Sequence, residues 1–348
     1  MSSRLNGAAL IGAAAIGAAL FAAVRRESRR ISFEGKSVLI VGGSRGLGLV
    51  IARQLAREGA RVSLAARNVE ELERASVDLH RRGATQVGTV VCDVRKRAQV
   101  DRMVAEVAAA RGGLDVLIND AGVIQVGPAS HMKIEDFEDA LATHFWGPLY
   151  TILAALPHLR QSASPRIVNI SSIGGRVAVP HMLPYSASKF ALVGLSEGLH
   201  SELAREGIRV TTVSPGLMRT GSTYNATFKG QHRLEFAWFH LADALPGLSV
   251  DVRSAARQIL EACRRGDAQL VISLPARFAV VAQALFPRMM AAMMSAANRV
   301  LPGPSDADGD EDRPGWQSIS RAAPSLLSRT ADRATFENNE VPVLSGVR

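Results

Sequence analysis

Cysteine is nearly absent from the chain, whose 348 residues include only Cys92 and Cys263. Two cysteines cannot build a disulfide framework, and they form no cluster with the spacing of metal ligands. We therefore expect two buried thiols in a reducing compartment and no bound metal ion. Aromatic residues are scarce, at 5% of the chain, and no basic stripe with interleaved aromatics indicates a nucleic-acid partner.

Acidic residues are too few to balance the basic ones. The formal net charge is +9, mostly from arginine, while hydrophobic residues make up 47% of the chain. The arginines are dispersed except for Arg25, Arg26, Arg29 and Arg30, which directly follow an apolar run. A basic excess suits nucleic acid, an anionic membrane or an anionic cofactor, and the position of this cluster favours a membrane.

The apolar run extends from Leu5 to Val24, with Asn6 as its only polar residue. A helix needs about 20 apolar residues to cross roughly 30 Å of hydrocarbon, so the run is long enough. The arginines behind it would hold the rest of the chain on the cytoplasmic side, whereas a cleaved signal peptide carries its charges in front. Residues 1–30 are therefore predicted to be a membrane anchor with a basic flank. A surface-bound helix and a poorly ordered terminus of a cytoplasmic protein are the alternatives.

From Lys36 onward, short β-branched runs alternate with helical stretches. The expected strands lie at 37–41, 61–65, 87–91, 115–119, 166–170, 209–213 and 269–273. Their continuous apolar character is typical of strands buried on both faces, and parallel strands require helical crossovers between them. The pattern predicts an α/β domain over 31–275, a Rossmann-type doubly wound parallel sheet flanked by helices. Such sheets bind ligands at the carboxyl ends of their strands.

Two segments follow this domain. Residues 276–301 are apolar and rich in methionine, with a break at Pro287. They are predicted to form a helical extension that lies near the substrate entrance or dips into a membrane interface. Residues 302–348 begin with an acidic run rich in glycine and proline, so they are predicted to be a largely disordered tail.

The first predicted strand ends in Gly-Gly-Ser-Arg-Gly-Leu-Gly, residues 42–48. Glycines at these spacings permit a tight turn, close approach of the backbone to a pyrophosphate and close packing of the next helix. The amide groups at that helix N-terminus would face the phosphates. Because the motif stands between a strand and a helix, it predicts a dinucleotide-binding site.

Further motifs follow in order along the chain. They are Asp93 after the third strand, Asn-Asp-Ala-Gly at 119–122, Ser172, Tyr185-x-x-x-Lys189 and Pro215-Gly216. Together with the glycine-rich turn they resemble the short-chain dehydrogenase/reductase family over residues 34–275. The resemblance implies a nicotinamide-dependent oxidoreductase acting on CH–OH and C=O groups. It also implies a homodimer or homotetramer, paired through helices around 136–162 and 184–206.

The resemblance assigns catalysis to Ser172, Tyr185 and Lys189. Ser172 would hydrogen-bond the substrate oxygen, with Ser171 as the weaker candidate, and Lys189 would bind the nicotinamide ribose. Tyr185 would be the general acid or base. Lys189 follows it by four residues and so shares its helix face, and the lysine charge should lower the tyrosine pKa from about 10.

NADP (NADPH) is the expected cofactor. NAD-preferring relatives carry an acidic residue at the end of the second strand, where this chain has Ala66 followed by Arg67, and Arg45 stands within the glycine-rich turn. Two guanidinium groups without a nearby carboxylate suit a ribose phosphate. The cofactor-binding residues that the resemblance implies are Gly42, Ser44, Arg45, Gly46, Leu47, Gly48, Arg67, Asp93, Val94, Asn119, Ala121, Gly122, Tyr185, Lys189, Pro215, Gly216 and Thr220. Among them, Asp93 would contact adenine.

Two positions depart from the family pattern. Val41 stands where threonine is usual, which removes a hydroxyl hydrogen bond from the turn. His144 replaces an asparagine that completes a catalytic tetrad in many members. As a fourth candidate catalytic residue it could hold water near Lys189 and add a pH dependence near neutrality, or it could slow proton relay.

Aromatic residues gather between Met218 and Gly247, the region that forms the variable lid over the substrate in this family. They either contact the substrate or pack the lid onto the core. The predicted function is NADPH-dependent interconversion of a hydrophobic carbonyl and its alcohol. The alternatives are a membrane-associated NADPH-binding regulatory or scaffold protein with little turnover, and a cofactor-dependent isomerase or dehydratase.

Overall fold

The computed structural model describes residues 27–245, 247–305, 307–320, 323 and 329–341. Its centre is a sheet of seven parallel strands in the order β11-β7-β6-β4-β1-β2-β3. The strands are β1 (Ser37–Val41), β2 (Arg61–Ala66), β3 (Val87–Val91), β4 (Val116–Asn119), β6 (Arg166–Ile170), β7 (Arg209–Pro215) and β11 (Gln269–Ile272). The predicted Rossmann-type doubly wound sheet is confirmed, and each strand overlaps one of the predicted runs, with ends that differ by at most two residues.

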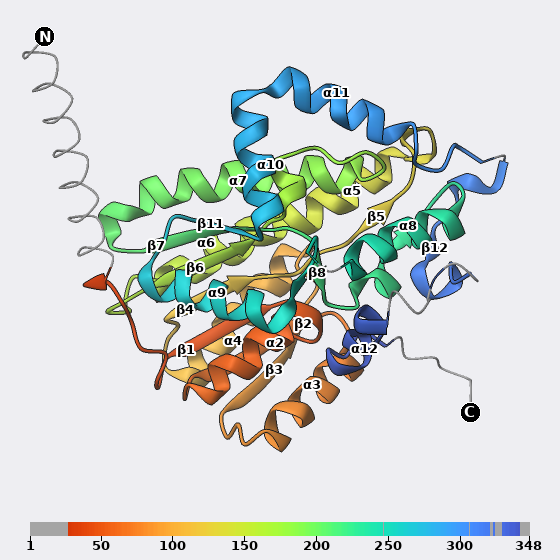
Figure 1. The fold of residues 1–348 in the computed structure, drawn as a ribbon. Coiled ribbons are helices and arrows are strands. Elements are labelled where there is room, and N and C mark those ends of the chain that lie inside the picture. Colours follow the sequence, from red (N-terminus) through yellow and green to blue (C-terminus); the bar gives the residue numbers. More distant parts are fainter. Residues whose placement is uncertain (1–26, 246, 306, 321–322, 324–328, 342–348) are drawn as a thin grey trace, which may run out of the picture.

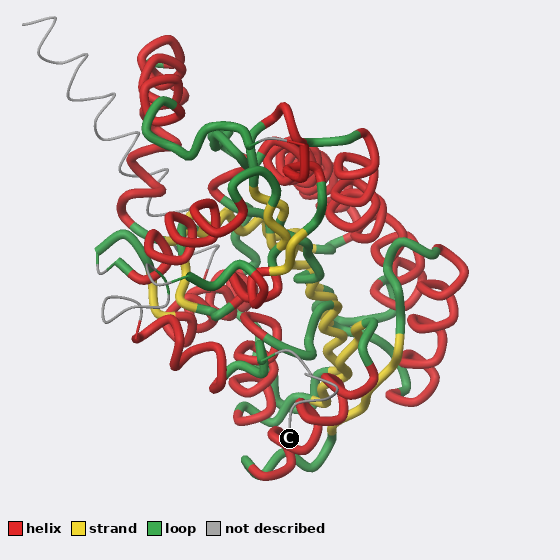
Figure 2. The backbone as a smooth tube through the Cα atoms, turned by 90° about the vertical axis from the view of Figure 1, so that its right-hand side faces the viewer, coloured by secondary structure: helices red, strands yellow, loops and turns green. Residues whose placement is uncertain are grey.

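Helices cover both faces of this sheet, as Figures 1 and 2 show. The helices α2 (Gly46–Arg57), α3 (Val69–Arg81) and α9 (Val252–Arg265) pack on one face. The opposite face is covered by α4 (Arg97–Arg111), α6 (Gly147–Leu159) and α7 (Leu183–Leu203). Successive strand residues point to opposite faces, so Leu39 joins one apolar cluster and Ile40 the other. Burial on both sides explains why the strands are apolar throughout.

The order in which the strands are added to the sheet reverses at β1. It runs outward from β1 to β2 and β3, and then crosses back to β4 on the other side of β1. In open α/β sheets a crevice forms at the carboxyl ends of the strands at such a reversal, and ligands bind there. The fold therefore places the glycine-rich turn, which follows β1, at this crevice.

Short elements that the sequence did not predict complete the domain. A three-stranded sheet is formed by β5 (Gln125–Val126), β9 (Thr227–Phe228) and β12 (Arg313–Pro314), and a two-stranded one by β8 (Met218–Arg219) and β10 (Val250–Asp251). The remaining helices of the domain are η1 (Ala129–His131), α5 (Ile134–Leu141), the π-helix η2 (Ala142–Trp146), η3 (Ile173–Gly175), η4 (Ala204–Glu206), η5 (Ser222–Asn225) and α8 (His232–Ala244).

The predicted membrane anchor, residues 1–30, lies almost wholly outside the described residues and stays a prediction. Within the part of the chain that the structure describes, no helix combines the length and the apolar character needed to cross a membrane.

The apolar extension 276–301 consists of two helices, α10 (Leu274–Leu285) and α11 (Pro287–Asn298), which project from the domain at the top of Figure 1. The first helix ends at Leu285 and the second begins at Pro287, because proline lacks the amide hydrogen that a continuous helix would need there. Large apolar side chains are exposed on both helices, with Phe278 72% exposed. No residue of either helix lines the large cavity described below, and the expectation that the extension lies near the substrate entrance or in a membrane interface stays a prediction.

The segment 302–348 was predicted to be largely disordered, and this is wrong for its described residues. They form η6 (Ala307–Asp310), β12, η7 (Gly315–Gln317) and α12 (Arg329–Glu337). The strand β12 pairs with β9, and His131 Nδ1 lies 2.8 Å from Asp310 Oδ1. Specific contacts to the domain outweigh the acidic, breaker-rich composition on which the prediction rested.

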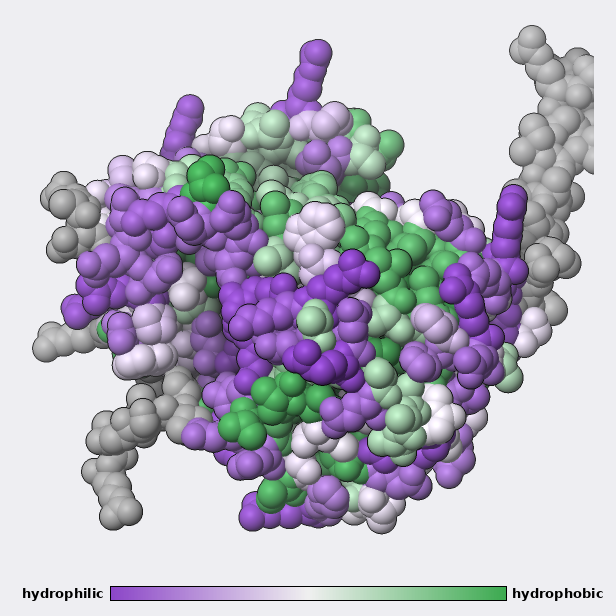
Figure 3. Space-filling model, turned by 180° about the vertical axis from the view of Figure 1, so that it is seen from behind, coloured by the Kyte–Doolittle hydropathy of each residue, from purple (hydrophilic) through white to green (hydrophobic). Residues whose placement is uncertain are grey.

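An apolar area lies on the face covered by α4, α6 and α7. Figure 3 shows apolar side chains, in green, gathered in the upper half of this face. Exposed apolar side chains on α6, α7 and the adjoining η2 include Trp146, Leu153 and Phe190. They fall within the two segments expected to pair in an oligomer, and that pairing stays a prediction.

Candidate active site

A cavity of about 590 Å³ opens at the carboxyl ends of β1, β2 and β4. It brings together most of the residues that the sequence predicted for cofactor binding and catalysis. Those that line it are Gly42, Ser44, Arg45, Gly46, Leu47, Arg67, Asp93, Val94, Ala121, Gly122, His144, Tyr185, Lys189 and Thr220. The other predicted residues are set back from its wall, namely Gly48, Asn119, Ser172, Pro215 and Gly216.

The glycine-rich turn packs tightly against the loop that follows β4. Gly42 adopts φ +90°, and a Cβ there would lie 2.5 Å from the backbone nitrogen of Ala121. A Cβ on Gly48 would lie 2.3 Å from the carbonyl oxygen of Gly42. Only glycine permits this conformation and these approaches. Because α2 begins inside the turn, at Gly46, its first amide groups lie where a pyrophosphate would bind.

The candidate catalytic residues lie together at the other end of the cavity. The hydroxyl groups of Ser172 and Tyr185 are hydrogen-bonded to each other. Ser172 Oγ also accepts a hydrogen bond from the amide of Gly174 at 3.0 Å, so its own proton is directed to the tyrosine oxygen. Ser171 instead donates to the carbonyl oxygen of Lys189 at 3.0 Å, so its hydroxyl supports the helix.

The acidity of Tyr185 differs from the sequence-based expectation. Burial raises the pKa of Tyr185 to about 12, the hydrogen bond with Ser172 lowers it, and the charges of Asp243 and Asp120 raise it. The ammonium nitrogen of Lys189 is 5.7 Å from the centre of the tyrosine ring. At this distance its charge does not outweigh burial, and Asp120 offsets it. The expectation of a lowered pKa is therefore wrong, and the phenol is protonated at neutral pH.

Asp120 is a residue of this site that the sequence analysis missed, although it stands within the quoted motif at 119–122. Its carboxylate accepts a hydrogen bond from the amide of Gly48 in α2, and the positive charge of Lys189 opposes the rise that burial causes in its pKa. For Lys189, burial lowers the pKa and Asp120 raises it. Lys189 Nζ also donates to the carbonyl oxygen of Ile170 at 2.9 Å. The two charged groups thus stabilise each other between the turn and α7.

His144 is completely buried in the π-helix η2. Its Nε2 accepts a hydrogen bond from the amide of Val123 at 3.1 Å, and its Nδ1 lies 2.7 Å from Ser188 Oγ. The Ser188 hydroxyl donates to the carbonyl oxygen of Tyr185 at 2.8 Å, so Nδ1 is assigned the proton that it donates to Ser188. Burial and the charge of Lys189 hold the pKa of His144 well below its ordinary value. The expectation that it titrates near neutrality is therefore wrong.

These contacts make His144 a positioning residue, because it joins the loop after β4 to the helix that carries Tyr185. We expect His144→Ala to leave the Val123 amide without its partner. An unsatisfied buried donor costs about 1–3 kcal/mol, or roughly 2–12 °C in melting temperature for a domain of this size. Thermal unfolding would measure the change, with the exposed His80→Ala as control. If the activity of the wild type changed with an apparent pKa near 6.5 and that of His144→Ala did not, the assignment of a neutral His144 would be wrong.

Asn119, one of the residues predicted to bind the cofactor, does not line the cavity, and its side chain is engaged in the sheet behind it. Its amide nitrogen donates to Asn169 Oδ1 at 2.9 Å, and its amide oxygen accepts from Thr151 Oγ1 at 2.7 Å. Asn169 in turn donates to Ser196 Oγ at 3.0 Å. This buried polar chain ties β4 to β6 and α7, the elements that carry the two halves of the site.

Asp93, predicted to contact adenine, lines the cavity with its carboxylate bound to Arg95. The guanidinium donates to it through Nη2 at 2.8 Å and Nε at 3.0 Å. These hydrogen bonds are the main reason why the pKa of Asp93 lies below its ordinary value. A carboxylate has further acceptor capacity, so the pairing leaves room for a contact to an amino group.

Arg45 and Arg67 both line the end of the cavity away from Tyr185. The premise that no carboxylate lies near them is wrong for Arg45. Glu71 Oε1 is 3.5 Å from Arg45 Nη1, and its other oxygen accepts from Ser44 Oγ at 3.0 Å. Glu340 Oε2 is 3.5 Å from Arg45 Nε. Neither glutamate was predicted from the sequence. Glu71 could have been, because it lies in the first turn of α3, shortly after the end of β2. No feature of the sequence around Glu340 indicated that it lies near Arg45.

The lid aromatics pack against one another and do not face the cavity. The Phe228 and Phe236 rings meet edge to face at 5.5 Å, and those of Phe228 and Phe239 at 6.2 Å. With Tyr224 and Trp238 they belong to an apolar cluster against which Ile124 and Tyr185 of the cavity wall also pack, and none of the five lines the cavity itself. The structure thus shows packing of the lid aromatics, and their contact with a substrate stays a prediction.

Comparison with known proteins supports the fold and the class of enzyme. The family model described as short chain dehydrogenase matches residues 36–229. An uncharacterized oxidoreductase of Staphylococcus aureus (strain MRSA252) is 34% identical over 194 residues, which are 55% of this chain and 83% of that protein. Another from Staphylococcus haemolyticus is 31% identical over 211 residues, 61% of this chain and 89% of that protein.

Two solved structures have the same fold. A dehydrogenase/reductase from Sinorhizobium meliloti 1021 aligns with a TM-score of 0.62 at 30% identity, over 71% of this chain and 97% of that one. A variant of actinorhodin polyketide ketoreductase, solved with NADPH, aligns with a TM-score of 0.62 at 30% identity, over 68% of this chain and 95% of that one. With its parallel sheet and the Ser172–Tyr185–Lys189 cluster, the chain belongs to the short-chain dehydrogenase family and is an oxidoreductase of that type.

Proposed function

We propose that the protein is an NADPH-dependent oxidoreductase that interconverts a hydrophobic carbonyl compound and its alcohol. The observation that carries the proposal is a single cavity that extends from Tyr185, hydrogen-bonded to Ser172, to Arg45 and Arg67. The nicotinamide of NADPH would bind at the end that holds Tyr185, and its phosphorylated ribose would bind at the end that holds the two arginines. The ketoreductase with the same fold was solved with NADPH, which supports this choice of cofactor by analogy.

The residues present fit a dinucleotide. Close approach of the backbone is possible at Gly42, where a side chain would collide with the neighbouring loop. Positive charge is available at both ends of the cavity, from Lys189 at one and from Arg67 at the other, where Arg45 lies beside the carboxylates of Glu71 and Glu340. An arginine can bind a phosphate in bidentate fashion, so Arg67, together with Arg45 once it exchanges these carboxylates, would suit a ribose phosphate.

The chemistry of the protein side chains follows from their hydrogen bonds. When bound, the nicotinamide supplies or accepts the hydride. The Ser172 hydroxyl, which donates to Tyr185 when no substrate is present, would turn to hydrogen-bond the substrate oxygen, and the Tyr185 phenol would transfer its proton to that oxygen as the alcohol forms. Lys189, held near the ring by the carbonyl oxygen of Ile170, stabilises the phenolate that remains.

The proposed substrate class rests on the cavity wall near Tyr185. Val123, Ile124, Met218 and Ala226 line it there with apolar atoms. Apolar walls with a few convergent polar groups are typical of sites for small hydrophobic molecules. We therefore infer an aldehyde, ketone or alcohol whose remaining groups are apolar.

The choice of cofactor gives a further prediction. The double variant Arg45→Ala/Arg67→Ala is expected to weaken NADPH binding by about a hundredfold or more, because it removes two charge-assisted interactions that are each worth about 1.5–3 kcal/mol. NADH, which lacks the ribose phosphate, should bind nearly as before. Fluorescence titration with both nucleotides measures the two affinities, with the exposed Arg97→Ala as control. Equal loss for NADPH and NADH would contradict the preference.

A further inference from the structure

The C-terminal segment 329–340, composed of α12 and the three residues after it, binds at the glycine-rich turn. In Figure 1 α12 lies beside α8 and close to α3, far from the helical extension that precedes it along the chain. Its last residues reach α2, and Glu340 lines the large cavity together with Gly46 and Arg45. A segment distant in sequence therefore forms part of the expected cofactor site.

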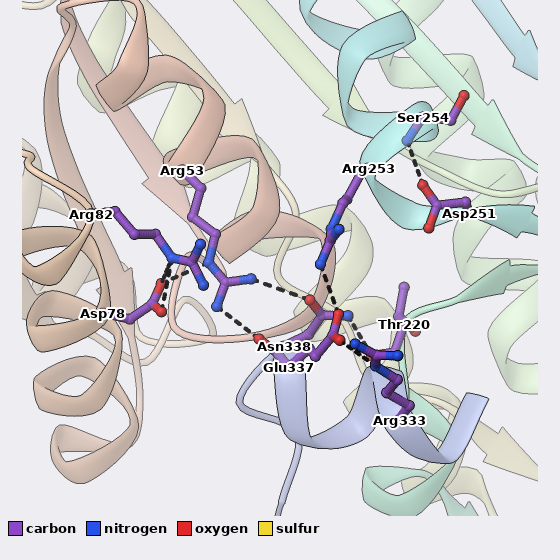
Figure 4. Close-up of polar contacts among 10 residues, drawn as sticks. All are labelled: Arg53, Asp78, Arg82, Thr220, Asp251, Arg253, Ser254, Arg333, Glu337 and Asn338. Carbon is purple, nitrogen blue, oxygen red and sulfur yellow. Dashed lines mark hydrogen bonds and ion pairs between the residues drawn. The ribbon is translucent and has the colours of Figure 1, made fainter. Parts of the chain in front are cut away.

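Two arginines of the domain hold the end of α12, as Figure 4 shows. Arg53 of α2 donates to the carbonyl oxygen of Glu337 at 2.7 Å and to Asn338 Oδ1 at 3.3 Å. Arg253 of α9 pairs with the Glu337 carboxylate at 2.8 Å. Asn338 Nδ2 donates to the carbonyl oxygen of Thr220 at 3.2 Å. Three separate elements of the domain thus contact one short stretch of the segment.

A tight turn after α12 directs the chain into the cavity. Asn339 adopts φ +60°, a left-handed conformation that asparagine tolerates better than most residues. The amide of Glu340 donates to the carbonyl oxygen of Thr335 at 2.9 Å, which closes a Schellman-type helix end. Asn339 Nδ2 donates to the carbonyl oxygen of Ser44 at 2.8 Å, inside the glycine-rich turn. The turn after α12 is therefore hydrogen-bonded to the glycine-rich turn, whose backbone would bind the phosphates of the cofactor.

This turn places Glu340 at the wall of the cavity, where it is only 3% exposed. Asn225 Nδ2 donates to its carboxylate at 2.6 Å and to its carbonyl oxygen at 2.8 Å. Its other carboxylate oxygen lies 2.5 Å from where a Cβ on Gly46 would be. The amide of Gly46 already donates to the carbonyl oxygen of Asn338 at 2.9 Å. A carboxylate and a carbonyl thus occupy the N-terminus of α2.

We propose that the groove between α2, α9 and Thr220 is a binding site for the chain's own C-terminal segment, which competes with the pyrophosphate of the cofactor. This inference rests on the proposed function. The carbonyl oxygen of Asn338 already accepts from the first amide of α2, and the Glu340 carboxylate lies against Gly46, so the segment and a pyrophosphate would occupy the same helix N-terminus and exclude each other. The cofactor then binds only the fraction of molecules whose segment has left the groove, which weakens its apparent affinity by that fraction.

The opposite arrangement, in which the segment closes over a bound cofactor, predicts effects of opposite sign. A closing segment would be ordered by NADPH, and its removal would weaken NADPH binding. A competing segment is released by NADPH, and its removal strengthens NADPH binding. The two are therefore separated by the direction of each change.

The test compares NADPH affinity among the full chain, a chain ending at residue 328, and Glu340→Gln. We expect the dissociation constant to fall by about tenfold or more in the truncated chain, and by a smaller factor in Glu340→Gln, which keeps the turn but loses the charge. The exposed Glu206→Gln, with the same loss of charge, should leave the affinity unchanged. A synthetic peptide of residues 329–348, added to the truncated chain, should weaken NADPH binding again.

Hydrogen exchange in the full chain gives a second readout that needs no deletion. Adding NADPH should speed amide exchange in 329–340 while slowing it in the glycine-rich turn. Unchanged or weaker NADPH binding after truncation would overturn the inference, as would slower exchange in the segment, and both would leave the proposed function standing. NADPH binding by neither the full nor the truncated chain would overturn both.

Discussion

Replacement of Tyr185 by phenylalanine is expected to lower reductive turnover by about 10²–10⁴-fold, the usual contribution of a positioned general acid. The variant loses only the hydroxyl that is hydrogen-bonded to Ser172. The ring should stay in place, because it packs edge to face against His144 with ring centres 5.4 Å apart. Cofactor binding should therefore persist. NADPH oxidation across a panel of hydrophobic aldehydes and ketones, together with a binding titration, measures both quantities.

Tyr150→Phe is the matched control, because Tyr150 stacks on Trp146 at 6.0 Å and does not line the cavity. It should keep full turnover. Residual turnover in Tyr185→Phe close to that of the wild type would contradict the assigned role. If the wild type binds NADPH tightly but reduces no carbonyl, and Tyr185→Phe binds it equally, the regulatory alternative gains support and the enzyme assignment fails.

The parts of the fold and site that the sequence predicted are those with a local physical signal. A strand buried on both faces must be apolar throughout, and for this reason runs such as Ser37–Val41 could be located. The turn at Gly42 requires a residue without a side chain, so glycine reveals it. Tyr185 and Lys189 were found through spacing within one helix. In each case the requirement lies within a few adjacent residues.

The parts that could not be predicted depend on residues distant in sequence. The proton position on His144 follows from Val123 and Ser188, which approach it from opposite sides. The pKa of Tyr185 depends on how deeply the lid buries it, and spacing to Lys189 carries no such information. Glu340 has no local signal at all, because its partners Arg45 and Asn225 lie in other parts of the domain.

The pH dependence of the two reaction directions should differ sharply. Burial raises the pKa of Tyr185 to about 12, so the phenol is protonated throughout the physiological range. Reduction uses the protonated form, and its kcat/KM should be insensitive to this group up to about pH 10. Oxidation needs the phenolate, whose fraction grows about tenfold for each pH unit below the pKa. Oxidative kcat/KM should therefore rise about tenfold for each pH unit.

Initial rates in both directions, measured from about pH 6 to about pH 10, test this prediction. A tyrosine pKa lowered toward neutrality by Lys189 would give the opposite result. Reduction would then decline above neutral pH, and oxidation would reach a plateau there. Either observation would show that the effect of Lys189 on Tyr185 outweighs burial.

Asp243 of the lid helix α8 offers a way to move this profile. Burial raises the pKa of Asp243 to about 8, so it becomes an anion only above that pH. Its charge then raises the pKa of Tyr185, because a second anion nearby disfavours the phenolate. Asp243→Asn should consequently speed alcohol oxidation about three- to tenfold near pH 9, equivalent to a shift of roughly half to one pKa unit.

Near pH 6 the same substitution should change little, because Asp243 is already protonated there and asparagine replaces a neutral group. This dependence on pH separates an electrostatic effect from a structural one, since a misplaced α8 would alter the rate at both pH values by the same factor. The exposed Asp101→Asn, which removes a charge far from the cavity, should have no effect at either pH. An equal rate ratio for Asp243→Asn at both pH values would therefore contradict the coupling between Asp243 and Tyr185, and burial and the charge of Asp120 would remain as the causes of the raised tyrosine pKa.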